Sequence, residues 1–67
     1  MGDGTALKIQ LVRHSITQSE LARRLGVSRS SVSTNLQKER LAPETLLLYR
    51  KTVADVLEER ERIKKGL

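Results

Sequence analysis

Apolar residues recur along this chain at intervals of three and four, the spacing that gives a helix one buried face. No strand is expected, and no internal repeat, low-complexity tract or linker divides the sequence. The pattern predicts an all-α protein in which residues 1–67 form a single domain. Its helices are expected at about residues 6–14, 18–25, 28–37 and 43–65.

The first predicted helix directs Leu7 and Leu11 inward, with Ile16 following them into the core. Ile9 or Val12 is expected to fill its flanks. His14 has no cysteine and no evident carboxylate partner, so a place near the negative end of this helix suits it better than metal binding.

The segment 17–37 combines two short helices with a glycine turn. Thr17 is a plausible N-cap, and Glu20 three residues later completes a capping box. Gly26 can take the left-handed conformation that ends a helix, and Ser28 is a fresh N-cap for the next one. Two helices joined in this way form the ground plan of a DNA-reading helix-turn-helix.

Packing of these two helices is expected to depend on a few apolar positions. Ala22 is small enough to let the helices cross closely, with Val32 beside it. Leu36 follows Val32 at i, i+4 on the inward face. Val27 is expected to point back into the core.

At this point the chain resembles the Cro/C1-type (XRE-like) repressor family of phages and bacteria. The matching residues are Gln18, Leu21, Ala22, Leu25 to Ser28 and Val32, with Glu44 to Leu47 after the loop. The resemblance covers about residues 6–57 and implies a compact lambda-repressor-like domain of four helices, or five. One departure is Asn35, where the family usually has an apolar residue, which predicts a rolled or shifted recognition helix. The family's glycine after that helix and its separate fifth helix are also not visible here.

The second helix of the motif would enter the major groove. Arg29, in its first turn, can bond O6 and N7 of a guanine together. The resemblance implies that Gln18 binds a phosphate and braces Arg29. Each serine or threonine of this helix, taken alone, is equally consistent with a solvated surface. Several such weak helix formers in one helix favour a surface that contacts a partner. The predicted DNA-binding residues are Gln18, Ser28, Arg29, Ser30, Ser33, Thr34, Gln37 and Lys38.

Charge supports this assignment. The net charge is +5, and residues 17–40 carry five basic residues against two acidic ones, whereas residues 41–67 carry six against five. Tyr49 is the only aromatic residue, which argues against a base-stacking platform for single strands. Double-stranded DNA, bound with a steep salt dependence, is the expected partner.

Several function classes are disfavoured. The chain has no cysteine, no phosphate-binding glycine loop and no activated nucleophile, so we expect no enzyme, no metal, no cofactor and no small-molecule ligand. No apolar run approaches a membrane span, and the N-terminus lacks signal-peptide features. These features favour a cytoplasmic, nucleoid-associated protein of a bacterial host, and the family resemblance suggests a phage or mobile element.

After a loop at residues 38–42 that tucks Leu41 inward, Pro43 suits the first turn of a long last helix. One stripe of this helix is Leu46, Tyr49, Val53, Val56, Arg60, Ile63 and Leu67, and a neighbouring stripe is Leu47, Ala54 and Leu57. We expect one stripe to face the body and the other a second subunit. The residues assigned to dimerisation are Tyr49, Val53, Val56 and Ile63. The alternative is that residues 46–57 close a monomeric core and residues 58–67 fray.

Two i, i+4 pairs, Glu58–Arg62 and Glu61–Lys65, favour a helix that persists toward its end. Taken together with the family resemblance, the sequence predicts a homodimeric transcription regulator, a repressor that binds a palindromic operator with the helix at residues 28–37 in the major groove. The alternative is a protein-interaction module, an antirepressor or assembly factor, that uses its C-terminal helix.

Overall fold

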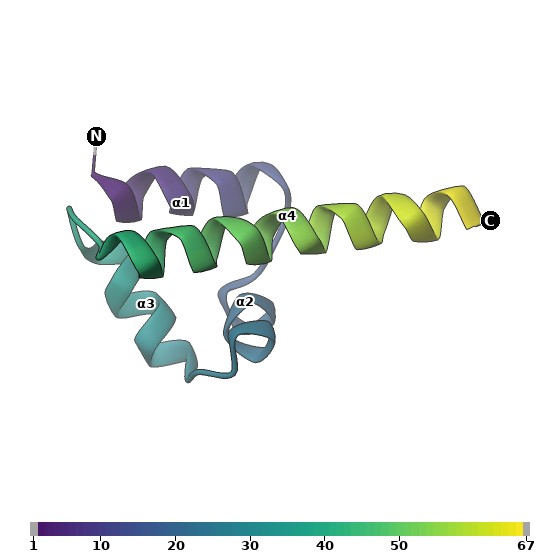
Figure 1. Cartoon of the computed structure of the whole chain (residues 1–67). Coiled ribbons are helices and arrows are strands. Elements are labelled where there is room, and N and C mark those ends of the chain that lie inside the picture. Colours follow the sequence, from purple (N-terminus) through teal and green to yellow (C-terminus); the bar gives the residue numbers. More distant parts are fainter. Residues whose placement is uncertain (1, 67) are drawn as a thin grey trace.

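The computed structural model describes residues 2–66, and the side chains of residues 2–64. Within this part the protein is all-helical, with four helices and no strand: α1 Asp3–Arg13, α2 Gln18–Leu25, α3 Arg29–Gln37 and α4 Pro43–Gly66. Helices α1 and α4 run in the same general direction (Figure 1). Helix α3 packs against both α1 and α2, and α4 packs against α1 and α2. The last turns of α4 extend beyond the body, which makes the molecule elongated, 39 × 24 × 19 Å.

Helix α1 begins at Asp3, three residues earlier than its apolar pattern predicts. Its N-cap, Gly2, has no side chain to bond the first amides. The loop after α3 supplies the acceptors instead: Asp3 N donates to the carbonyl of Glu39 at 2.7 Å and Gly4 N to that of Lys38 at 3.0 Å. The Asp3 carboxylate in turn accepts from the amide of Leu41 at 3.1 Å. A helix start that depends on such a distant loop, 38 positions away in the case of the Asp3–Leu41 bond, is not visible to a local pattern.

Gly4 is buried where α1 approaches the end of α3. A Cβ at this position would lie 2.6 Å from the carbonyl oxygen of Lys38 and closer still to that of Leu36. Because real Cβ atoms are not found so near backbone oxygens, only glycine fits here without moving the helices apart.

The C-terminus of α1 is closed by backbone bonds from Ile16 N to Leu11 O at 2.8 Å and from Ser15 N to Val12 O at 3.2 Å. This arrangement needs a left-handed residue, and Ser15 takes it with φ of 55°. Arg60 of α4 adds a further cap, because its guanidinium donates to the carbonyls of His14 and Ser15. His14 is thus the C-cap of α1, as predicted.

Helices α2 and α3 have the bounds and caps that the sequence predicts, within a residue. The hydroxyl of Thr17 accepts from Glu20 N at 3.0 Å, and that of Ser28 accepts from Ser31 N at 3.1 Å. Gly26 ends α2 with φ of 73°. The side chain of Val27, however, is 45% exposed, so the expectation that it enters the core is wrong. Its amide bonds the carbonyl of Ala22, and this closing of the turn leaves the side chain outside.

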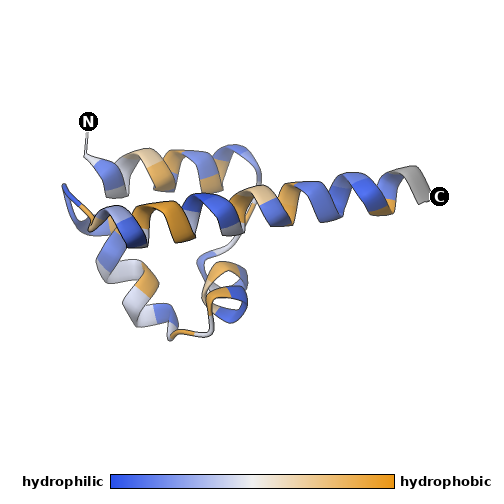
Figure 2. Cartoon of the chain, viewed as in Figure 1, coloured by the Kyte–Doolittle hydropathy of each residue, from blue (hydrophilic) through white to orange (hydrophobic). Residues whose placement is uncertain are grey.

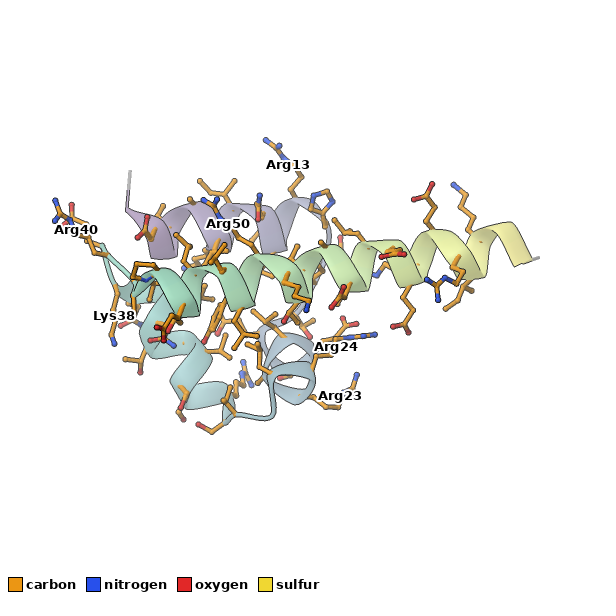
Figure 3. The ribbon with its side chains drawn as sticks, viewed as in Figure 1. Arg13, Arg23, Arg24, Lys38, Arg40 and Arg50 are labelled. Carbon is orange, nitrogen blue, oxygen red and sulfur yellow. The ribbon has the colours of Figure 1, made fainter. Side chains whose placement is uncertain are left out.

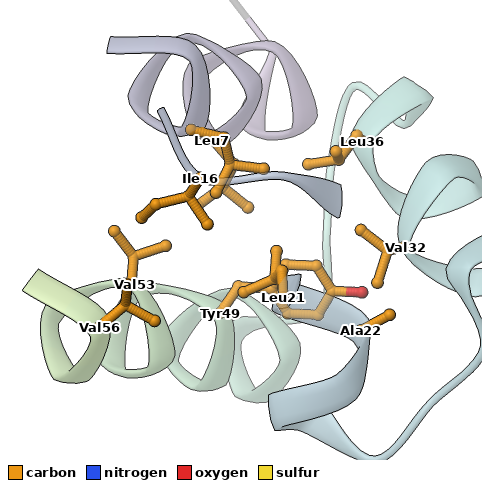
Figure 4. Packing of buried hydrophobic residues seen from close by; sticks show 10 residues of the cluster. Leu7, Ile16, Leu21, Ala22, Val32, Leu36, Tyr49, Val53 and Val56 are labelled. Atoms are coloured by element: carbon orange, nitrogen blue, oxygen red, sulfur yellow. The ribbon is translucent and has the colours of Figure 1, made fainter. Parts of the chain in front are cut away.

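All four helices contribute to one core (Figure 4). Ala22 and Val32 are both buried in it, as the close crossing of α2 and α3 requires. Ile9 and Val12, expected on the flanks of α1, are instead 43% and 73% exposed, because α3 and α4 cover only the side of Leu7 and Leu11. The core consists of Leu7, Leu11, Ile16, Leu21, Ala22, Val32, Leu36, Tyr49, Val53 and Val56, with Leu25, Leu41, Leu46 and Leu57 packed against it.

The fold overturns part of the predicted dimer surface. Tyr49, Val53 and Val56 are 3%, 4% and 1% exposed in a single chain, because their stripe of α4 closes the core against α1 to α3. They are therefore not available to a second subunit. Ile63 lies past the body on the same stripe and is 60% exposed. Leu67 and the side chain of Lys65 lie outside the described residues.

Helix α4 changes character along its length. Its first half carries the apolar residues that contact the body, and its last turns are almost wholly hydrophilic (Figure 2). The predicted Glu58–Arg62 pair is present at 3.1 Å. Within residues 2–66, no helix is both long and apolar enough to cross a membrane.

Candidate functional site

The candidate site is the exposed face of α3. Its core face is held by Val32 and Leu36, which are 0% and 4% exposed. Fixing these two positions fixes the opposite face, because side chains along a helix advance by a constant rotation. On that opposite face Ser30, Thr34 and Gln37 are exposed to solvent. Arg29, exposed in the first turn, and the half-buried Ser33 lie on the flank beside them.

Two shallow hollows flank this row of side chains. The first is lined by Gln18, Arg29, Ser30, Ser33 and Thr34, so the first residue of α2 and the first turns of α3 share one surface. The second is lined by Ser30, Ser31, Thr34, Asn35 and Lys38. Seven of the eight residues predicted to bind DNA are thus brought together around α3 in the hollows or at its N-cap, and the eighth, Gln37, is exposed on its last turn.

Ser28 differs from the other predicted residues because its hydroxyl already has local partners. It accepts from the amide of Ser31 and lies 3.0 Å from the hydroxyl of Ser31. Its main role in the free protein is to cap α3 and so to fix the helix start. Lys38 is the C-cap of α3, where its exposed ammonium stands at the negative end of the helix.

The position usually apolar in the resembling family is occupied here by Asn35, and a hydrogen bond explains how this polar residue fits. Its amide nitrogen donates to the hydroxyl of Tyr49 at 2.9 Å, so the half-buried amide and the buried phenol satisfy each other. Within the described residues no buried side-chain nitrogen or oxygen lacks a partner. Asn35 therefore ties α3 to α4, a link that sequence reasoning missed although it had singled out both residues.

The basic residues do not all belong to this face (Figure 3). Arg24 was counted with it from the sequence, but it lies between α2 and α4, 2.8 Å from Glu59 and 3.8 Å from Glu20. The hydrogen bond and charge of Glu59 raise the pKa of Arg24, and the Arg24 guanidinium lowers the pKa of Glu59. Arg60 approaches Glu20 as well, at 3.5 Å.

Without Arg24, the α3 surface is still electropositive. Residues 28–38 include two basic residues, Arg29 and Lys38, and no acidic residue. This surface presents hydrogen-bond donors and acceptors on short side chains. The guanidinium of Arg29 lies at the N-terminus of α3, where the helix dipole is positive. Among residues 2–64, no group of three or more His, Asp or Glu side chains lies together as metal ligands would.

Such a face can approach an extended polar surface, because the hollows are shallow and open rather than enclosed. An enclosed pocket would be expected for a small molecule. Comparisons with protein-family models, with curated proteins and with solved structures gave no match.

Proposed function

We propose that this protein is a sequence-specific, double-stranded DNA-binding regulator, a repressor that binds a palindromic operator as a homodimer. The observation that carries the proposal is the row of Arg29, Ser30, Ser33, Thr34 and Gln37 along one accessible side of a helix that the core holds in place. A helix of this kind fits the major groove, where its side chains can reach base edges.

The two short helices and the turn between them support the proposal. The caps at Thr17 and Ser28, the left-handed Gly26 and the buried Ala22 and Val32 are features that we expect of a helix-turn-helix. All of these residues except Thr17 are also among those that carry the resemblance to Cro/C1-type repressors. Gln18 shares a hollow with Arg29, which suits the phosphate-binding and bracing role implied by that resemblance.

Each residue then has a defined task in the proposed complex. Arg29 reads a guanine, while Gln18 and Lys38 contact phosphates on either side of the groove. The hydroxyl side chains contact base edges or phosphates. Lys38 is expected to contribute mainly to affinity and to its salt dependence, and Arg29 to the choice of sequence.

The test is selection from a randomised duplex DNA pool at about 0.15 M salt, with the mass of the complex measured. The proposal predicts an enriched palindrome, with half-sites about one helical turn apart, bound by two chains. Binding that is only salt-sensitive and indifferent to sequence, or absent, would contradict it.

Replacement of Arg29 by Ala distinguishes recognition of a base from nonspecific electrostatic attraction to DNA. We expect specific affinity to fall by about 1–3 kcal/mol and discrimination at one base pair to relax. Arg13→Ala is the matched control, because Arg13 is an exposed arginine on the side of α1 that lies away from α3 (Figure 3). Equal losses in the two variants would show that charge alone drives binding.

A protein-interaction module is the second candidate, and α4 is the feature that favours it. The helix reaches past the body and exposes Leu47 at 69% and Ile63 at 60%. In this case changes at Arg29 would leave function intact, and changes on α4 would abolish it.

A further inference from the structure

The side of α4 that faces away from the core is accessible along the whole body. We call this surface the outer face; it consists of Leu47, Arg50, Lys51, Ala54, Glu58 and Glu61, all exposed. These positions follow helical spacing and lie opposite the buried stripe of Tyr49, Val53 and Val56. Leu47 is 69% exposed, more than the other exposed large apolar residues of α4, Leu48 at 52% and Ile63 at 60%.

The charges of the outer face are divided at Ala54. The basic residues Arg50 and Lys51 precede it, and the acidic residues Glu58 and Glu61 follow it. Within the described part of the chain, Arg50 and Lys51 are in no ion pair, whereas Glu58 pairs with Arg62 along the helix at 3.1 Å. A surface that is basic on one side of its centre and acidic on the other is complementary to itself when turned by half a rotation.

We propose that the occupant of the outer face is α4 of a second copy of this chain, packed antiparallel about a two-fold axis near Ala54. This places Lys51 within one residue of the level of Glu58 of the second copy, and Arg50 within one helical turn of Glu61 of the second copy, each pair on one flank and occurring twice. The small side chain of Ala54 at the crossing lets the helices approach closely. Parallel packing would instead set Lys51 against Lys51 and Glu58 against Glu58.

The antiparallel arrangement also orients α3, and in this respect the inference rests on the proposed function. One flank of α4 faces α2, through Glu59 and Arg24. The other faces α1 across a hollow lined by Gln10 and Leu57 together with two residues of the outer face, Arg50 and Ala54. The two-fold axis of an antiparallel pair runs from one flank to the other, perpendicular to α4. Both copies of α2 and α3 therefore lie on the same side of the dimer, as two recognition helices on one duplex must (compare Figure 1).

The contact is small. Residues 47–61 span about 21 Å of helix, at 1.5 Å per residue. An interface of this length, rimmed by exposed ion pairs, is expected to dissociate on dilution and in high salt. DNA with two half-sites would strengthen it, because it holds two chains together.

The absence of cysteine from the chain allows a direct test. Ala54→Cys places a single thiol near the two-fold axis, and mild oxidation should link two chains about tenfold faster than in Lys8→Cys, which carries its thiol on exposed α1. Equal rates of linkage would overturn the proposal, as would a wild-type protein that stays monomeric both free and on DNA.

Charge reversal tests the register. By sedimentation equilibrium without DNA, Lys51→Glu and Glu58→Lys should each raise the dimer dissociation constant about tenfold, and the double variant should recover most of the loss. Arg62→Ala controls for the Glu58–Arg62 pair within the helix, Lys8→Glu is the control for charge, and circular dichroism verifies folding. Failure of the double variant to recover would overturn the antiparallel register.

The two proposals can fail independently. Selection of a palindrome bound by two chains, with no effect of the α4 reversals on dimerisation, would leave the proposed function standing and remove this interface. Dimerisation through the outer face without any selected DNA sequence would do the opposite.

Discussion

Two small residues, Gly4 and Ser15, hold backbone positions that their neighbours in space determine. Gly4 allows α1 to contact the carbonyls that end α3, and Ser15 takes the left-handed conformation that ends α1. Neither residue was identified from the sequence, because glycine and serine are also common in exposed turns. Their roles can be tested by single substitutions.

Replacement of Gly4 by Ala should lower the free energy of unfolding by about 1–3 kcal/mol, because the added methyl group must push the backbone of α1 away from α3. Urea unfolding measures the loss. Thr5→Ala, one residue further along and exposed, should change stability by less than about 0.5 kcal/mol. Similar values for both variants would mean that the approach of α1 to α3 is not tight.

Ser15→Gly should have the opposite effect and stabilise the protein by about 1 kcal/mol, because glycine adopts a φ of 55° without the steric cost that serine bears. Thermal unfolding is a sufficient measurement. Ser15→Ala keeps the Cβ and should show no gain. A gain with Ala as large as that with Gly would contradict the left-handed conformation.

At the level of helices, α3 is held from both sides. Val32 and Leu36 fix its core face, and the bond from Asn35 to Tyr49 ties its last turns to α4. The sequence marked Asn35 as a break in the apolar pattern and predicted a rolled helix. The structure gives the reason for the polar residue, since the chain's only tyrosine offers it a partner.

Loss of this bond in Tyr49→Phe should cost about 0.5–1.5 kcal/mol of stability. Asn35→Ala should cost a similar amount, and the two losses should be less than additive in the double variant because they remove the same interaction. Additive losses in chemical denaturation would show that the two side chains do not act together.

Across the whole molecule, an ion-pair network joins α2 to α4. Arg24 contacts Glu20 and Glu59, while Arg60 contacts Glu20 and caps the end of α1. The sequence presented Arg60 as an interruption of an apolar stripe. In the structure it is the point at which α4 leaves the body, so a charged residue that can reach three partners suits the position better than an apolar one.

The network makes stability depend on pH. The Arg24 guanidinium lowers the pKa of Glu59, so ionised Glu59 stabilises the folded protein above the pKa of Glu in the unfolded chain, about 4.3. This contribution is lost as pH falls through the lowered value. Glu59→Gln should therefore reduce the melting temperature at neutral pH and flatten its fall in acid, whereas Glu39→Gln, on the loop, should do neither. If the melting temperatures of wild type and Glu59→Gln changed in parallel with pH, the stabilising ion pair of Arg24 and Glu59 would be contradicted.

Local signals determined much of this protein. The helix bounds around Gly26, the caps at Thr17 and Ser28, and the inward positions of Val32 and Leu36 follow from interactions within four residues, which the sequence displays directly. The exposed positions of Ser30, Thr34 and Gln37 follow as well, since one buried side of a helix defines the other.

Tertiary structure decided what lies against what. The early start of α1 needs the loop after α3, the core role of Tyr49, Val53 and Val56 needs three other helices, and the engagement of Arg24 needs Glu59. Helical periodicity shows that a stripe is buried, but it does not say whether its own chain or a second copy covers it. That choice depends on how four helices share a small core, which is a property of the assembled chain and not of any one segment.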